Sequence, residues 1–92
     1  MKFIHEQNRI YANDEKGKVV AEITFPEEDS GVVNIDHTFV DTSLRGQGIA
    51  SKLMQEACKE IEDQGKRAIP TCPYAIKWFE KNHRDRERLV KK

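Results

Sequence analysis

The sequence has few cysteines, no net charge and no long hydrophobic run, and each absence excludes a class of protein. It contains 2 cysteines among 92 residues, Cys58 and Cys72, and their separation fits no zinc-binding pattern. Small secreted domains are usually cross-linked by more than one disulfide, so both are predicted to be thiols in a cytoplasmic protein. The three histidines likewise lack the spacing of metal ligands: His5, His37 and His83.

The charge balance and the hydrophobic pattern argue against nucleic acids and membranes as partners. The 16 basic and 16 acidic side chains cancel, so nothing overall favours nucleic acid or an anionic membrane as a partner. No apolar run approaches the length that crosses a bilayer, and the N-terminal "MKFIHEQNRI" is not a signal peptide. We therefore expect one small globular domain over residues 1–92, with a marginal core that a tightly bound ligand would stabilise.

The first forty residues are typical of antiparallel strands. The segment "FIHEQNRIYA" predicts either one strand or a tight pair broken near Gln7 and Asn8, and "PEEDSG" predicts a loop. Two further segments alternate between apolar and polar residues, as strands do. In the first, one face carries Val19, Ala21, Ile23 and Phe25. In the second, the face carrying Val33, Ile35, His37 and Phe39 alternates with Asn34, Asp36 and Thr38.

The apolar period then changes to that of an amphipathic helix. Its apolar stripe is Ile49, Ala50, Leu53, Met54, Ala57, Cys58 and Ile61. A short strand in "KRAIPT" and a second helix in "PYAIKWFEKN" follow, and residues 82–92 are predicted to be a flexible tail. The fold class is therefore α/β, with order β-β-β-α-β-α, two main helices and one mixed antiparallel and parallel sheet.

The turn Arg45-Gly46-Gln47-Gly48 lies between the third predicted strand and the long helix. The first amides of a helix have no partner inside it, and they carry the positive end of its dipole. Glycines let a ligand approach this backbone, which predicts an anion site, most naturally for phosphate. The P-loop and dinucleotide signatures are both absent. On glycine content alone, a loop without a ligand remains an alternative.

The longer segment "VDTSLRGQGIASKL" resembles the acyl-CoA signature of the GNAT superfamily of N-acetyltransferases. That signature, Arg/Gln-x-x-Gly-x-Gly/Ala between a strand and a helix, is matched by Arg45, Gly48 and Ala50. The later segment "CPYAIKWFEK" is similar to a second helix of the family. The resemblance covers about residues 18–82 and implies a truncated GNAT-like fold, without the outer segments with which most members bind the acceptor.

The resemblance implies acetyl-CoA as the acyl donor, with no metal. Backbone amides of the turn would hold the pyrophosphate, the preceding strand would contact pantetheine, and Phe79 would line the pantetheine channel. The implied cofactor-binding residues are Thr38, Phe39, Val40, Arg45, Gly46, Gln47, Gly48, Ile49, Ala50, Ser51 and Phe79. The acceptor would be an amine, on a small molecule or a protein, that the sequence does not name.

Two residues are candidates for catalysis. Cys72 is expected at the end of a strand and before a helix, a position that favours the thiolate and would let it accept the acetyl group. His37 would act as a general base for an amine or for Cys72. The alternatives are a buried apolar thiol and a hydrogen-bonded core histidine. Asp36, on the opposite strand face, is a weaker candidate for the base.

Three functions remain open from the sequence. The leading hypothesis is acetyl transfer to an amine, directly or through Cys72. The second is an acetyl-CoA-binding module without catalysis, favoured by Phe79, which lies where relatives often carry a tyrosine that protonates the leaving thiolate; Tyr74 would project from a different place. The third is a structural domain with an empty loop.

Overall fold

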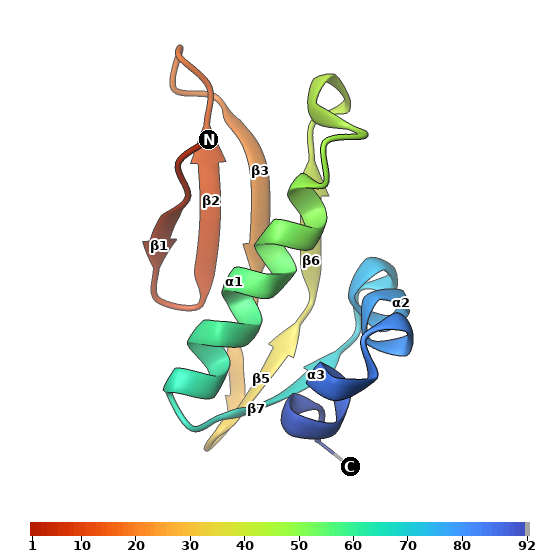
Figure 1. The fold of residues 1–92 in the computed structure, drawn as a ribbon. Helices are drawn as coiled ribbons and strands as arrows, with labels where there is room; N and C mark the ends of the chain where they lie inside the picture. The colour runs from red at the N-terminus through yellow and green to blue at the C-terminus, as the bar shows by residue number, and fades with distance from the viewer. Residues whose placement is uncertain (92) are drawn as a thin grey trace.

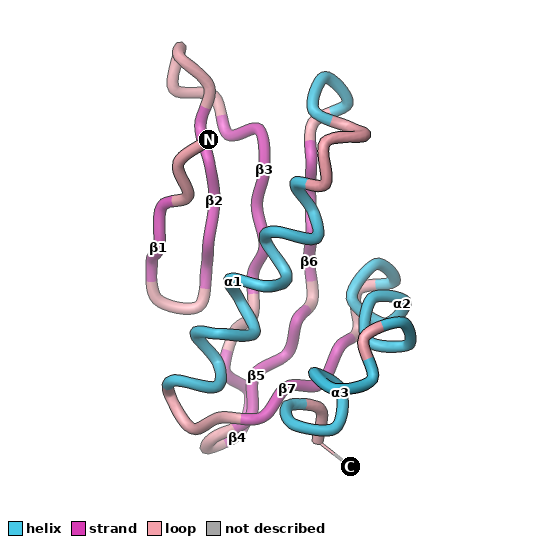
Figure 2. Tube along the Cα trace, in the orientation of Figure 1, coloured by secondary structure: helices cyan, strands magenta, loops and turns pink. Residues whose placement is uncertain are grey.

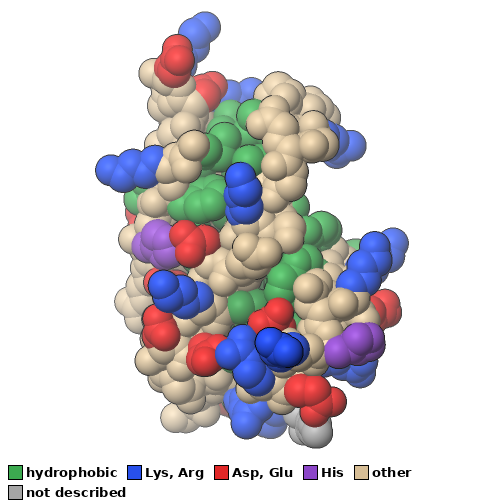
Figure 3. Space-filling view, in the orientation of Figure 1, with side chains coloured by type: hydrophobic (Ala, Val, Ile, Leu, Met, Phe, Trp, Pro, Cys, Tyr) green, Lys and Arg blue, Asp and Glu red, His purple; other side chains and the backbone are tan. Residues whose placement is uncertain are grey.

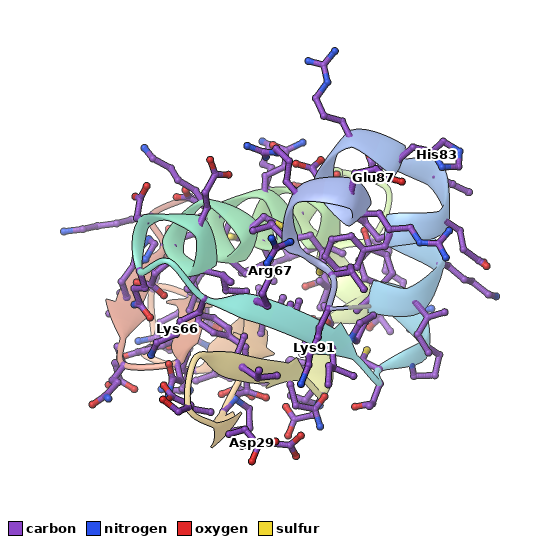
Figure 4. All side chains as sticks on the ribbon, turned by 90° about the horizontal axis from the view of Figure 1, so that it is seen from below. Asp29, Lys66, Arg67, His83, Glu87 and Lys91 are labelled. Carbon is purple, nitrogen blue, oxygen red and sulfur yellow. The ribbon has the colours of Figure 1, made fainter. Side chains whose placement is uncertain are left out.

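The computed structural model describes residues 1–91, in which three helices cover one side of seven strands (Figure 1). The strands are β1 (Ile4–Glu6), β2 (Arg9–Asn13), β3 (Val19–Thr24), β4 (Glu27–Asp29), β5 (Val32–Ile35), β6 (His37–Val40) and β7 (Arg67–Pro70). The helices are α1 (Ile49–Asp63), α2 (Pro73–Lys81) and α3 (His83–Leu89), and a single 3-10 turn, η1, spans Thr42–Leu44. The view from below shows the helices together on one side of the strands (Figure 4).

The strands form two sheets, whereas the sequence predicts one mixed sheet. One sheet has the antiparallel order β1-β2-β3-β6, and the other has the order β4-β5-β7, in which β5 and β7 are parallel. The first predicted segment is a pair of strands that turns at Asn8, where φ is 61°. The predicted loop "PEEDSG" contains β4, which pairs with β5.

The division into two sheets arises at Asp36, where the third predicted strand breaks into β5 and β6. Val33 and Ile35 are buried against the helices, as predicted. The break inserts one residue, and such an insertion moves every later side chain to the opposite face. Thr38 and Val40 therefore share the helix-covered face, since they lie opposite the buried Ile23 and Ala21 of β3. His37 and Phe39 face away, which corrects the prediction that they share a face with Val33 and Ile35.

The core lies between the strands and α1, as the helical period predicts. The buried side chains of α1 are Ile49, Leu53, Met54, Ala57, Cys58 and Ile61. They pack against Ile10, Ala21 and Ile23 of the first sheet and Val33 and Ala68 of the second. One helix thus holds the two sheets together. Within residues 1–91, none of the helices is both long and apolar enough to cross a membrane.

The end of the chain differs from the predicted flexible tail. Residues 83–89 form α3, Leu89 is 2% exposed within the core, and the Lys91 amide donates to the Ala68 carbonyl over 2.9 Å. Lys92, the last residue of that predicted tail, lies outside the described residues. The charge of the segment is consistent with this packing, because Arg88 forms ion pairs with Glu62 of α1 and with Asp85.

Candidate functional site

The turn between β6 and α1 is shaped by one aspartate and two glycines. Asp41 accepts hydrogen bonds from the backbone amide and the hydroxyl of Ser43, over 3.1 and 2.5 Å, and these bonds lower the pKa of its carboxyl. They start η1, which carries the chain away from β6. Gly46 and Gly48 then adopt φ values of 84° and 72°, in the left-handed region that favours glycine.

Gly48 is the N-cap residue directly before α1, and no side chain caps this end of the helix. The Gly48 carbonyl accepts the first helical hydrogen bond, from the Lys52 amide over 3.1 Å. The preceding amides, of Ile49, Ala50 and Ser51, have no acceptor within the helix. The positive end of the helix dipole and a glycine backbone without side chains therefore meet at one place, which suits an anion.

A cavity of about 360 Å³ opens beside this helix end. Its wall comes from β6, the turn, the first turn of α1 and the first turn of α2: Thr38, Val40, Leu44, Arg45, Gly46, Gly48, Ile49, Ala50, Ser51 and Tyr74. Hydrophobic side chains reach the surface on this face of the molecule, including where α1 approaches α2 (Figure 3). The cavity thus combines an apolar wall with the uncapped amides of α1.

The cavity brings together most of the residues that the sequence assigns to the cofactor. It is lined by eight of those eleven residues: Thr38, Val40, Arg45, Gly46, Gly48, Ile49, Ala50 and Ser51. The lining does not include Gln47, Phe39 or Phe79. Phe39 faces the other side of the sheet because of the break at Asp36, and Phe79 is 2% exposed in the core, with its ring edge-on to Trp78 at 5.3 Å.

Two lining residues, Leu44 and Tyr74, are absent from the sequence-based set. Leu44 is the last residue of η1, and its position next to Arg45 in the motif could have indicated that it lines the site. Tyr74 reaches the cavity from the first turn of α2, a neighbour that only the fold reveals. Burial raises the pKa of the Tyr74 phenol, so its hydroxyl stays protonated at neutral pH. The Trp78 indole donates to the Ser51 hydroxyl over 3.3 Å, which joins α2 to α1 at this wall.

The strand β6 ends its sheet with a free edge beside the cavity. It pairs with β3 alone, while β7 pairs with β5, so β6 and β7 diverge beyond Ile35 (Figure 2). The Asp41 amide donates to the Val20 carbonyl over 2.8 Å. Since hydrogen-bonded pairs alternate along an antiparallel ladder, the amides of Thr38 and Val40 point away from β3, toward this edge. An extended ligand there would find unpaired backbone groups.

The two predicted catalytic residues lie near the divergence of the strands but on different sides of it. Cys72 is 8% exposed and packs in the core at the start of α2, where its amide and that of Thr71 both donate to the Ile35 carbonyl over 3.1 Å. His37 instead has a side chain that is 53% exposed on the opposite face. The position of Cys72 at the end of β7 agrees with the sequence, whereas its expected pairing with His37 lacks a contact in the described part of the chain.

His37 belongs to a polar network on the face away from α1. Its Nε2 lies 3.3 Å from Oε1 of Glu22, and Oε2 of Glu22 accepts a hydrogen bond from Arg9 over 2.5 Å. The Arg9 guanidinium lies 3.9 Å from the centre of the Tyr11 ring and also contacts Glu6. Asp36, the weaker candidate, accepts a hydrogen bond from the Thr24 hydroxyl over 2.5 Å. His37 is therefore an exposed surface residue whose ring contacts Glu22, and not a core histidine.

Cys58 lies in the core on the buried face of α1. Burial raises the pKa of the Cys58 thiol to about 12, so it is an apolar core residue, as predicted. Among residues 1–91, no group of three or more histidine, cysteine, aspartate or glutamate side chains is arranged to hold a metal ion.

The chain matches a known protein family over most of its length. The family described as GCN5-related N-acetyl-transferase matches residues 9–89. The chain belongs to this family. No curated protein sequence matches it.

Solved structures of the N-acetyltransferase family share the fold. A GCN5-like protein from Staphylococcus aureus, solved by NMR, is 28% identical with a TM-score of 0.80, over 97% of this chain and 87% of that one. A GNAT family N-acetyltransferase from Escherichia coli, crystallised with CoA, is 26% identical with a TM-score of 0.58, over 67% of this chain and 38% of that one. An acetyltransferase of Staphylococcus aureus Mu50 is 18% identical with a TM-score of 0.64 and shares the fold, and this chain spans 50% of its length.

Proposed function

We propose that this protein binds acetyl-CoA in the cavity between β6, α1 and α2. The supporting observation is the coincidence of three features in a member of the N-acetyltransferase family: the uncapped amides of α1, the glycines of the turn and the free edge of β6. The pyrophosphate would lie against the amides from Gly46 to Ser51. The pantetheine arm would follow β6 toward the divergence of β6 and β7. The similar Escherichia coli structure, which holds CoA, supports the same ligand class.

Titration with CoA while the backbone amides are followed by NMR tests this part of the proposal. The amides of Gly46, Gly48 and Ala50 should shift, whereas those of Gly31 and Gly65, in turns outside the cavity, should stay in place. A titration that leaves the amides of the turn unchanged would show that CoA does not bind there.

We further propose that the protein transfers the acetyl group to an amine. In the direct route, His37 takes a proton from the acceptor ammonium, and the amine nitrogen attacks the carbonyl carbon of the thioester. The new C–N bond forms as the C–S bond breaks, and the CoA thiolate takes the second proton lost by the nitrogen. The exposure of His37 on the face away from α1 supports this role, because an acceptor could reach it from that face and meet the thioester at the divergence of β6 and β7.

A route through Cys72 is an alternative path to the same product. Its sulfur would attack the thioester and release CoA, and the amine would then attack the acetylated Cys72. Intact mass after incubation with acetyl-CoA tests this path, since an adduct of one acetyl group should appear and should be lost in Cys72→Ser. Cys58→Ser is the matched control and should keep the adduct. Wild-type protein without an adduct would exclude a stable acetyl-cysteine.

A second function, acetyl-CoA binding without catalysis, is favoured by one observation. Phe79 has no hydroxyl, and it is buried against Trp78. Release of CoA from acetyl-CoA, measured with a panel of primary amines, separates the two functions. CoA binding without release in the presence of any amine would favour the binding module.

A further inference from the structure

Thr38 carries an unusual hydroxyl group. Among the side-chain atoms of residues 1–91 that are shielded from water, those without a hydrogen-bond partner are Asn8 Oδ1, Thr38 Oγ1 and Glu60 Oε2. Of the three residues, Thr38 is the one that lines the cavity. The unpartnered oxygen therefore belongs to the wall where a ligand is proposed to bind.

Other threonines show what the fold does when a hydroxyl has a structural use. The Thr24 hydroxyl donates to Asp36 over 2.5 Å, and the Thr71 hydroxyl donates to the Asn34 side chain over 2.6 Å. Both bonds connect neighbouring segments of the sheets. The Thr38 hydroxyl connects nothing, although Thr38 lies opposite Ile23 in a regular part of the β3–β6 ladder.

A buried hydroxyl without a partner lowers the stability of a protein, because the oxygen loses its hydrogen bonds to water and gains none. Valine has nearly the same shape and is well suited to a strand. Packing alone would therefore favour valine at position 38, next to Val40 on the same face of β6. The hydroxyl therefore lowers the stability of the unliganded protein, and its presence needs an explanation other than folding.

We infer that the Thr38 hydroxyl recognises the amide-bearing arm of the ligand and supplies a hydrogen bond that forms only in the complex. This inference rests on the proposed function, and it assigns a selective contact to one side-chain atom. Rotation about the Cα–Cβ bond would carry the hydroxyl out of its shielded position, and the residue lines the cavity in which the ligand is proposed to bind. The arm follows the free edge of β6, where amide and carbonyl groups of the ligand pass close to this residue.

Two ligands separate this contact from the rest of the site. CoA contains the pantetheine arm, whereas adenosine 3′,5′-bisphosphate is the nucleotide part without it. Thr38→Val should weaken CoA binding roughly three- to tenfold, the value of one net hydrogen bond, and should leave the bisphosphate unchanged. The same substitution should raise the Tm of the unliganded protein by roughly 4–8 °C, because it removes an unsatisfied buried group. Opposite effects on Tm and affinity are the signature of this inference.

Three variants serve as controls, with isothermal titration calorimetry and thermal unfolding as the readouts. Thr38→Ser keeps the hydroxyl and should bind CoA more tightly than Thr38→Val. Thr24→Val removes a hydroxyl that has a partner, so it should lower Tm and leave CoA affinity unchanged. Thr38→Ala repeats the loss of the hydroxyl if Thr38→Val fails to fold, and it should likewise weaken CoA alone.

The outcomes are distinct. Equal CoA affinity in wild type and Thr38→Val overturns the inference, as does equal weakening of both ligands. A fall in both Tm and affinity in Thr38→Val also overturns it, because the hydroxyl would then have a structural role. If wild-type protein binds neither ligand, the proposed function fails first, and this inference fails with it.

Discussion

Gly48 matters to the turn through its backbone conformation and not through packing. Its φ of 72° is left-handed, and a Cβ placed on it would meet no atom within 4 Å. Gly48→Ala should therefore act through the backbone and lower the free energy of unfolding by about 1–2 kcal/mol. The shifted amides should also weaken CoA binding.

Gly65→Ala is the matched control for Gly48→Ala. Gly65 has a φ of 68° and is equally open around its Cα, but it lies at the other end of α1. Chemical denaturation should give the two variants similar losses of stability, while CoA titration should detect a defect in Gly48→Ala alone. Equal CoA affinity in both variants would contradict a role for the turn conformation in binding.

Cys58 should be inert in the folded protein. Its thiol has a pKa of about 12, raised mainly by burial, so almost no thiolate is present at pH 8. In Cys72→Ser protein, where Cys58 is the remaining cysteine, iodoacetamide should add no mass under native conditions and one adduct in urea. Alkylation at equal rates in buffer and in urea would show that the thiol is accessible.

At the scale of the element, α3 contributes to stability through a single buried side chain. Leu89 is 2% exposed and lies in the core shared with α1 and α2. Leu89→Ala should lower the free energy of unfolding by about 2–5 kcal/mol, the usual cost of such a cavity. Ile76→Ala, on the outside of α2 with 42% exposure, should change it by less than about 0.5 kcal/mol. Urea denaturation of both variants would check this difference, and equal losses would argue against the packing of α3.

The elements with a regular period could be predicted from the sequence, and the exceptions have physical reasons. The stripe from Ile49 to Ile61 predicts α1 because its apolar residues repeat every three or four positions. The break at Asp36 could not be predicted from the apolar pattern, because a bulge of one inserted residue requires no particular residue types. That single break accounts for two errors: the face predicted for His37 and Phe39, and the number of sheets. The helix α3 was not predicted because segment 83–89 is highly charged and has no apolar period: Leu89 is its one buried residue.

The site was predictable to the extent that it depends on contiguous residues. The segment from Arg45 to Ser51 carries its own signal, because the turn and the helix end lie together in the chain. Tyr74 and the polar partners of His37 come from other elements, so only the packing of α2 and the register of β2, β3 and β6 reveal them.

At the scale of the whole molecule, a small core should make stability depend on the ligand. A ligand that binds only the native state at 100 times its Kd adds about 2.7 kcal/mol to the free energy of unfolding. Tm should therefore rise with CoA concentration well into the range above Kd. Thermal unfolding at several CoA concentrations would measure this rise, and AMP, which lacks both the pyrophosphate and pantetheine, is the control. A Tm independent of CoA would contradict ligand binding to the native state.

The break at Asp36 also has a consequence for the order in which substrates meet. It leaves the cavity on the helix-covered face of β6 and His37 on the opposite face. A donor and an acceptor that approach from opposite sides can be bound at the same time. Direct transfer would therefore pass through a ternary complex of protein, acetyl-CoA and amine, and it would give intersecting lines in double-reciprocal initial-rate plots. The route through Cys72 would instead release CoA from the acetylated protein before the amine binds, and it would give parallel lines.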